Sequence, residues 1–95
     1  SHYKNMVYFL PLKMSGVKTL DKFTVKAGET YKFTGAVTVN SGNVRIYVVC
    51  DGEIVLDIST GFFNSLPLSG VEGKCELRVA AESANFSLDI SIYPG

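Results

Sequence analysis

The sequence predicts an all-β protein: a single antiparallel β-sandwich, jelly-roll-like or Ig-like, of about 7–8 strands. Apolar and polar residues alternate with a period of two in one segment after another. Gly, Asn and Ser residues separate these segments at intervals of about 8–12 residues, and no stretch has the apolar spacing of an amphipathic helix. One apolar face per strand fits antiparallel sheets, which tolerate water on the other face.

The most informative segment is 43–59, where two runs rich in β-branched residues flank the pair Asp51-Gly52. An Asp-Gly pair between alternating apolar residues predicts a two-residue, type I′ hairpin turn. Fixing the turn assigns the two faces of the hairpin. The side chains expected to point inward are Val44, Ile46, Val48, Cys50, Ile54, Leu56 and Ile58. Those expected to point outward include Arg45, Tyr47, Val49, Val55 and Asp57.

Further strands are expected on both sides of this hairpin. Before it we expect strands over 5–13, with Pro11 marking an edge or a bent end, and over 20–25 and 31–39, with a bulge at Gly35. After it we expect strands over 62–68, where Pro67 marks an edge, and over 74–82 and 85–92. The intervening turns are expected at 15–16, 40–43 and 82–85.

Length and charge limit the classes of function. The 95 residues fit one domain over 1–95, and we expect Ser1 and His2 to be a vector-derived addition. Nine basic and nine acidic side chains balance, and no Lys/Arg cluster exceeds a pair, so we expect no nucleic-acid binding. No apolar run approaches the roughly 20 residues of a membrane-spanning helix, so no transmembrane segment is expected. A net charge of zero favours self-association, which leaves a homo-oligomer open.

The two cysteines are candidates for a disulfide. Cys50 ends one inward-facing strand and Cys75 begins another. If the strands alternate in direction from Val44 onward, both thiols lie at the same end of the sandwich and point into the core. A bridge there would stabilise the fold by roughly 3 kcal/mol in the chain-entropy model and would suit an exported protein. Two reduced core thiols remain the alternative.

Catalytic, cofactor-binding and metal-binding residues are not predicted. The single histidine is His2, so Ser-His and Cys-His pairs are not expected. Carboxylates leave one enzymatic alternative, a small enzyme that uses an acidic outer face. The residues of that face would be Asp51, Glu53, Asp57, Glu72, Glu76 and Glu82. We interpret them as a solvated polar face, because exposed carboxylates without a pocket do not catalyse.

Aromatic residues off the core face give the better candidate surface. Tyr47, Val49 and Val55 form an apolar strip on the face expected to be wet, and Arg45 and Asp57 flank it. Tyrosines on a β-sandwich can stack on sugar rings or anchor a protein partner. We expect the N-terminal strand, which is apolar on both faces, to cover Tyr47 and Val49; if it does not, the strip is a patch of the kind that marks an interface. The other aromatic candidates for exposure are Tyr3, Tyr8, Phe62, Phe63 and Tyr93.

The order of strand motifs resembles a known group of domains. FTVKAGETYKF at 23–33 is followed by Ser-Gly-x-Val-x-Ile at 41–46, an Asp-Gly turn, ELRV and a closing FSLDISI. Over about residues 20–92 this order resembles small jelly-roll-like β-sandwich domains of bacterial secreted proteins and lipoproteins. The resemblance implies an extracytoplasmic, secreted or cell-surface location and a non-catalytic role. It carries over no site residues.

The sequence therefore predicts a non-catalytic extracytoplasmic module that binds a protein partner or packs as an accessory domain. A carbohydrate-binding module that uses Tyr47 is the alternative. The chain lacks tryptophan, the residue that many such modules use as a platform for sugars.

Overall fold

The computed structural model describes residues 6–58 and 60–95, with side chains from Ser15 onward. These residues form five strands, all paired antiparallel. The strands are β1 (Met6–Val25), β2 (Tyr31–Cys50), β3 (Glu53–Ile58), β4 (Gly61–Leu68) and β5 (Gly73–Pro94). The all-β, antiparallel architecture that the alternation predicts is confirmed. The described residues form no helix that is long and apolar enough to cross a membrane.

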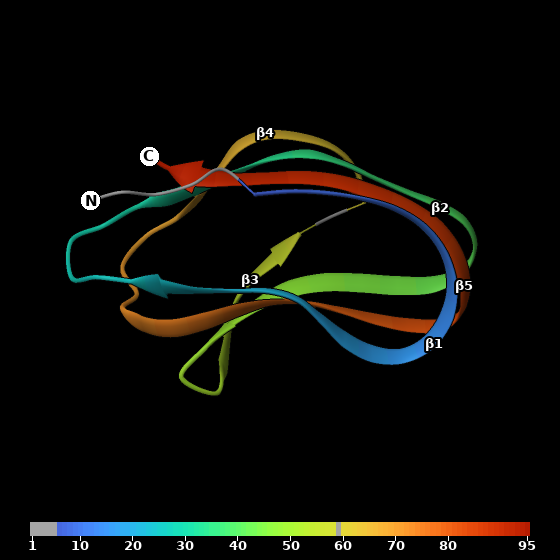
Figure 1. Cartoon of the computed structure of the whole chain (residues 1–95), viewed down its shortest axis with the longest axis horizontal. Helices are drawn as coiled ribbons and strands as arrows, with labels where there is room; N and C mark the ends of the chain where they lie inside the picture. The colour runs from blue at the N-terminus through green and yellow to red at the C-terminus, as the bar shows by residue number, and fades with distance from the viewer. Residues whose placement is uncertain (1–5, 59) are drawn as a thin grey trace.

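The strand β5 lies at the centre of the sheet. It pairs with β1 on one side and with β2 on the other, along nearly its whole length. The free side of β2 is shared, because its first half pairs with β4 and its second half with β3. The sheet therefore has the order β1-β5-β2, with β4 and β3 as successive edge partners of β2. Figure 1 shows the sheet curled, so that each long strand runs along one side of the molecule and returns along the other.

The three long strands bend at one common level, which we call the crease (14–16 in β1, 40–43 in β2 and 82–85 in β5). The pairing is irregular there: register shifts lie between Met14 and Gly16 in β1 and between Val39 and Asn43 in β2. Ser83 adopts a positive φ of 45°, and its backbone N–H donates to Ser15 Oγ at 2.9 Å. The crease is thus a line of bulges across neighbouring strands, which sharpen the local bend.

The crease accounts for the difference between the five strands and the seven or eight expected. The segments 15–16, 40–43 and 82–85 were expected to be turns between separate strands. They bend the chain, but the hydrogen-bonded ladder resumes on the far side of each bend because neighbouring strands bend together. The turn at Asp51-Gly52 forms as predicted, since both residues have positive φ (49° and 82°), as a type I′ turn requires.

The hydrophobic core lies between the two halves of the curled sheet. Its side chains come mainly from alternate positions of β2 and β5, which supply one face each to the interior. The largest fully buried side chains are Phe33, Phe86, Ile46, Leu77, Leu88, Ile90, Ile92, Val25, Val37, Val48, Val79 and Cys75. Among the described side chains, none of the buried ones is polar or charged. The period-two pattern of the sequence therefore determines which side of each strand meets the core.

Candidate functional site

The predicted surface on the outer face of β2 and β3 is closed by its own side chains. Arg45 donates from Nε to Asp57 Oδ1 at 2.8 Å and from Nη2 to Asp57 Oδ2 at 3.2 Å. The Arg45 guanidinium also lies 5.3 Å from the centre of the Tyr47 ring, within cation–π range. Tyr47 and Val49 are each only 8% exposed. The apolar strip that the sequence predicts is present, but it does not form an open patch.

Ion pairs on this face shift the pKa values of its carboxylates. The hydrogen bond from Arg45 holds the pKa of Asp57 below its ordinary value. On β5, Arg78 Nε lies 3.3 Å from Glu76 Oε1, and this bond, together with one from the Thr19 hydroxyl, lowers the pKa of Glu76. Two of the six carboxylates of the proposed acidic face are therefore held by arginines.

A bulge changes the composition of the predicted surface. The register shifts between Val48 and Val49, so Val49 faces Ile54 while Val48 faces Leu56, and Val55 is the extra residue between them. Val55 is half-buried and contacts the core cluster. Ile54, which was expected to point inward, is instead 48% exposed and lines a hollow beside Tyr47. Contrary to the prediction, Val55 does not lie beside Tyr47 on the outer surface. Ile54 lies there instead.

The hollow beside Tyr47 has a volume of about 450 Å³ and is lined by side chains of both charges. Its lining residues are Tyr47, Val49, Asp51, Gly52, Ile54, Lys74, Glu76 and Arg78. The Arg78–Glu76 bond lies within this lining. We call this the Tyr47 hollow.

The backbone pairing of the N-terminal strand contradicts the expectation that this strand covers Tyr47 and Val49. Residues 6–14 of β1 pair edge to edge with 84–92 of β5, so they extend the sheet instead of crossing its outer face. Tyr47 lies on the other half of the sheet, in register with Arg78 and Asp57. The side chains of 6–14, Tyr8 among them, and all of Tyr3 lie outside the described part of the chain.

Cys50 and Cys75 form a disulfide bond. The two residues are direct partners on the neighbouring strands β2 and β5, with their Cα atoms 4.1 Å apart. Both belong to the core, with 5% and 1% of their surfaces exposed. The bridge therefore ties two adjacent strands at the end next to the Asp51-Gly52 turn, instead of joining the two halves of the curled sheet.

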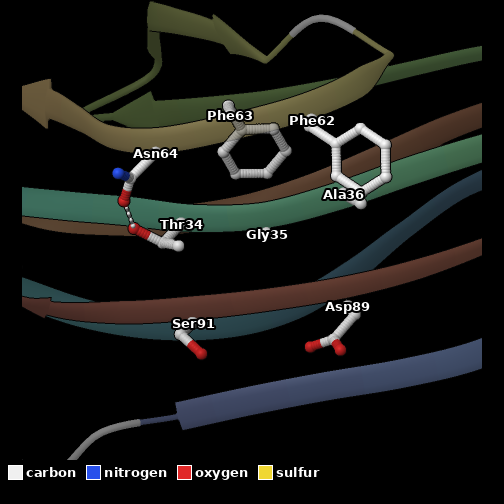
Figure 2. A pocket seen from close by; sticks show the side chains of 8 residues that line it. All are labelled: Thr34, Gly35, Ala36, Phe62, Phe63, Asn64, Asp89 and Ser91. Carbon is white, nitrogen blue, oxygen red and sulfur yellow. Dashed lines mark hydrogen bonds between the residues drawn. The ribbon is translucent and has the colours of Figure 1, made fainter.

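A second hollow, of about 570 Å³, lies on the other half of the sheet (Figure 2). Its lining residues come from β2, β4 and β5: Thr34, Gly35, Ala36, Phe62, Phe63, Asn64, Asp89 and Ser91. The ring of Phe62 is 95% exposed, which makes it the most exposed large apolar side chain among the described residues. We call this the Phe62 hollow.

The Phe62 hollow has an aromatic side and a polar side (Figure 2). Figure 2 shows the rings of Phe62 and Phe63 on the β4 side and the side chains of Asp89 and Ser91 on the β5 side. Gly35 lies between these sides, and a Cβ atom there would overlap the backbone oxygen of Asp89. The floor at this position therefore consists of backbone, because no side chain fits.

A hydrogen-bond network holds one end of the hollow. Thr34 Oγ1 donates to Asn64 Oδ1 at 3.2 Å and accepts from the Ser65 N–H at 3.0 Å. The Tyr93 hydroxyl lies 2.8 Å from Thr34 Oγ1 and 3.4 Å from Ser65 Oγ, and these bonds lower the pKa of Tyr93. Ser65 has a positive φ of 53° at a bulge of β4. The network thus fixes the side chain of Asn64 beside the hollow.

The sequence pointed to only part of this hollow. Phe62 and Phe63 were candidates for exposure, whereas Thr34, Asp89 and Ser91 come from strands far away in the chain. They meet because Gly35 pairs with both Phe63 and Ile90, and Ala36 with both Phe62 and Asp89. That register cannot be read from a single sequence, although the alternation does place Thr34, Ala36, Asp89 and Ser91 off the core face.

Metal binding finds no support in the described residues, which contain no group of three or more His, Cys, Asp or Glu side chains able to hold an ion. Comparison with known proteins gives no match to a family model, a curated protein or a solved structure.

Proposed function

We propose that this chain is a non-catalytic binding module of an extracytoplasmic protein, and that its ligand occupies the Phe62 hollow. The observation that carries the proposal is the phenyl ring of Phe62, 95% exposed beside a concave surface of about 570 Å³. Concave sites that combine apolar walls with a few convergent polar groups are the usual places for ligands. The hollow has this composition, since Thr34, Asn64 and Asp89 accompany the two phenyl rings.

Interaction with a protein partner is the first candidate for the role of this module. Aromatic side chains at the centre of interfaces often carry much of the binding energy. Phe62 is such a side chain, because it projects from β4 with almost no contact to its own protein. A carbohydrate is the alternative ligand.

The non-catalytic part of the proposal is supported by the ionisable groups of the hollow. Asp89 is the one ionisable side chain among its described lining residues. Acid–base catalysis normally needs a group whose pKa is tuned by neighbours, and often a second group beside it. A single carboxylate on an open surface fits a hydrogen-bonding role.

The extracytoplasmic part of the proposal is supported by the disulfide between Cys50 and Cys75. Disulfides form and persist in oxidising compartments, and they are rare in the reducing cytosol. Cytosolic thiols would reduce the Cys50–Cys75 bond, and the covalent link between β2 and β5 would then be lost.

We also infer that the curled sheet is a small jelly-roll-like sandwich. Each of the three long strands contributes to both halves of the sheet, while β4 completes one half and β3 the other. Divided at the crease, the chain would count about eight strand segments in two layers, which is the strand number of a jelly roll.

The binding proposal is tested by two screens of the whole chain: panning of a phage-displayed random peptide library and binding to an oligosaccharide array. We expect a ligand from at least one screen whose binding is lost in Phe62→Ala. Binding should survive in Val17→Ala, the matched control, because Val17 is an exposed apolar residue (64%) on β1. Ligands that bind both variants equally, or no ligand from either screen, would refute the proposal.

A further inference from the structure

The chemistry of the Phe62 hollow narrows the class of its ligand. The two walls differ: phenyl rings lie on one side, and the Asp89 carboxylate and the Ser91 hydroxyl lie on the other (Figure 2). A ligand that fills the hollow must therefore offer an apolar face in one direction and hydrogen-bonding groups in the other. Flexible apolar ligands lack the second feature, and small polar ions lack the first.

The charge of the hollow disfavours anionic ligands. Its described lining contains no lysine, arginine or histidine, and Asp89 brings a negative charge. Phosphate, sulfate and carboxylate groups are normally held by arginine, lysine or clustered N–H donors. A neutral ligand with several hydroxyl groups suits the site, because an ionised carboxylate accepts hydrogen bonds from two hydroxyls and these charge-assisted bonds are strong.

Phe62 provides the apolar contact. The face of a phenyl ring is the negative part of its quadrupole, so it attracts C–H groups that carry partial positive charge. The flat face of a pyranose ring presents several such C–H groups, while its hydroxyls project around the rim. Because Phe62 is 95% exposed, its ring is open to this contact without rearrangement of the core.

One polar group of the hollow, the Asn64 side chain, is held in place before a ligand arrives. Thr34 fixes Asn64 by accepting a bond from the Ser65 N–H and donating to Asn64 Oδ1. Gly35 lines the hollow without a side chain, and a Cβ there would overlap the Asp89 backbone oxygen, so the close approach of β2 and β5 keeps this position bare. A site that is organised in advance loses less entropy when it binds.

We propose that the Phe62 hollow binds a neutral pyranose unit of an oligosaccharide, which rests on the Phe62 ring and donates hydroxyl hydrogen bonds to Asp89. Asn64 and Ser91 supply further hydrogen bonds to the ligand. This inference rests on the proposed binding function and, of its two candidate ligands, takes the carbohydrate over the protein partner, because the lining is neutral or acidic and combines a ring with hydrogen-bond acceptors. Tyr47, which the sequence offered as the sugar platform, is 8% exposed and takes no part.

The test uses isothermal titration calorimetry and amide chemical-shift mapping on the whole chain. The probes are the neutral hexasaccharides cellohexaose, xylohexaose and mannohexaose, with hexagalacturonate as the charged counterpart. We expect at least one neutral probe to bind and to shift amide signals at 34–36, 62–64 and 89–91. Hexagalacturonate should bind more weakly than the neutral probes.

Variants at Phe62 and Asp89 then test the roles of the two walls. Phe62→Leu should raise the Kd about tenfold or more, because it keeps an apolar side chain but removes the ring, whereas Phe62→Trp should retain binding. Asp89→Asn should weaken binding by removing the charge-assisted bonds. Val17→Ala should leave the Kd unchanged. Melting curves of all four variants identify any loss of folding.

Three results would overturn the inference: no neutral probe binds at millimolar concentration, Phe62→Leu binds as tightly as the parent protein, or hexagalacturonate binds most tightly. If a phage-derived peptide nevertheless binds in a Phe62-dependent way, the sugar inference fails and the binding function stands. If neither peptides nor sugars depend on Phe62, both proposals fail.

Discussion

At the scale of single residues, the crease depends most on Gly42. Its φ is +78°, and a Cβ atom there would overlap the backbone oxygen of Ser83 and lie 2.6 Å from Ala84 Cα. The backbones of β2 and β5 thus approach more closely at this point than a side chain allows. Glycine is needed here both for its conformation and for its small size.

Replacement of Gly42 by alanine should therefore destabilise the fold more than the same change at Gly16. Gly16 also lies in the crease with a positive φ of 105°, but nothing lies within 4 Å of an added Cβ. We expect Gly16→Ala to cost about 1 kcal/mol from conformation alone, and Gly42→Ala to cost at least about 1 kcal/mol more. Urea unfolding of both variants measures the difference. Equal losses would show that the close approach to β5 carries no energetic weight.

The ion pair of Arg45 and Asp57 gives a prediction about pH. Because Arg45 lowers the pKa of Asp57 in the folded state, the pair stabilises the fold above the unfolded-state pKa of about 4. That contribution is lost as the pH falls through the lower folded-state pKa. It is small, since both side chains are more than half exposed.

A titration of carboxyl ¹³C signals tests this prediction. Arg45→Gln should raise the pKa of Asp57 and leave Glu76 unaffected, whereas Arg78→Gln should raise the pKa of Glu76 and leave Asp57 unaffected. The two variants are thus each other's control. An Asp57 signal that titrates identically with and without Arg45 would contradict the assignment.

At the scale of elements, β5 organises the molecule because it is hydrogen-bonded on both sides. Its alternate residues are buried from Cys75 to Ile92, apart from the shift at the crease. The edge strands β3 and β4 are short, whereas the edge strand β1 is long. The strand β4 also carries a bulge at Ser65 and a proline at Pro67. Both features interrupt the free edge and oppose pairing with another chain.

The disulfide between β2 and β5 should be the main covalent stabilisation of these elements. A bridge that closes a loop of this length is expected to contribute about 3 kcal/mol by restricting the unfolded chain. Urea unfolding with and without reductant should therefore give a lower free energy of unfolding for the reduced protein. The double variant Cys50→Ala/Cys75→Ala should unfold identically in both conditions. A parent protein that is insensitive to complete reduction would show that packing alone fixes the two strands.

At the scale of the whole molecule, the curl of the sheet creates the core and leaves two different outer faces. On one half, the Tyr47 hollow is lined by the paired Arg78 and Glu76, and the Arg45–Asp57 pair lies beside Tyr47. On the other half, the Phe62 hollow combines the exposed ring of Phe62 with the polar side chains of Thr34, Asn64, Asp89 and Ser91. The candidate site therefore lies on the opposite half of the sheet from the hairpin that identified the fold.

The sequence by itself determined the fold class, the type I′ turn and most of the core. These depend on local rules: side chains alternate across a strand with a period of two, and Asp51-Gly52 readily adopts positive φ. The bends at 15–16, 40–43 and 82–85 carried the same residues as true turns, so local composition could not tell them apart. Only pairing with neighbouring strands, which bend at the same level, kept the ladder continuous there.

The tertiary structure alone decided which outer surface is open. The bulge at Val55 moved Ile54 to the outside, and Arg45 closed over Tyr47. Phe62 and Asp89 line the same hollow only because β4 and β5 both pair with the same stretch of β2. A site on a sheet is built across strands that are distant in sequence, so it depends on register, which is a property of the assembled sheet and not of any one strand.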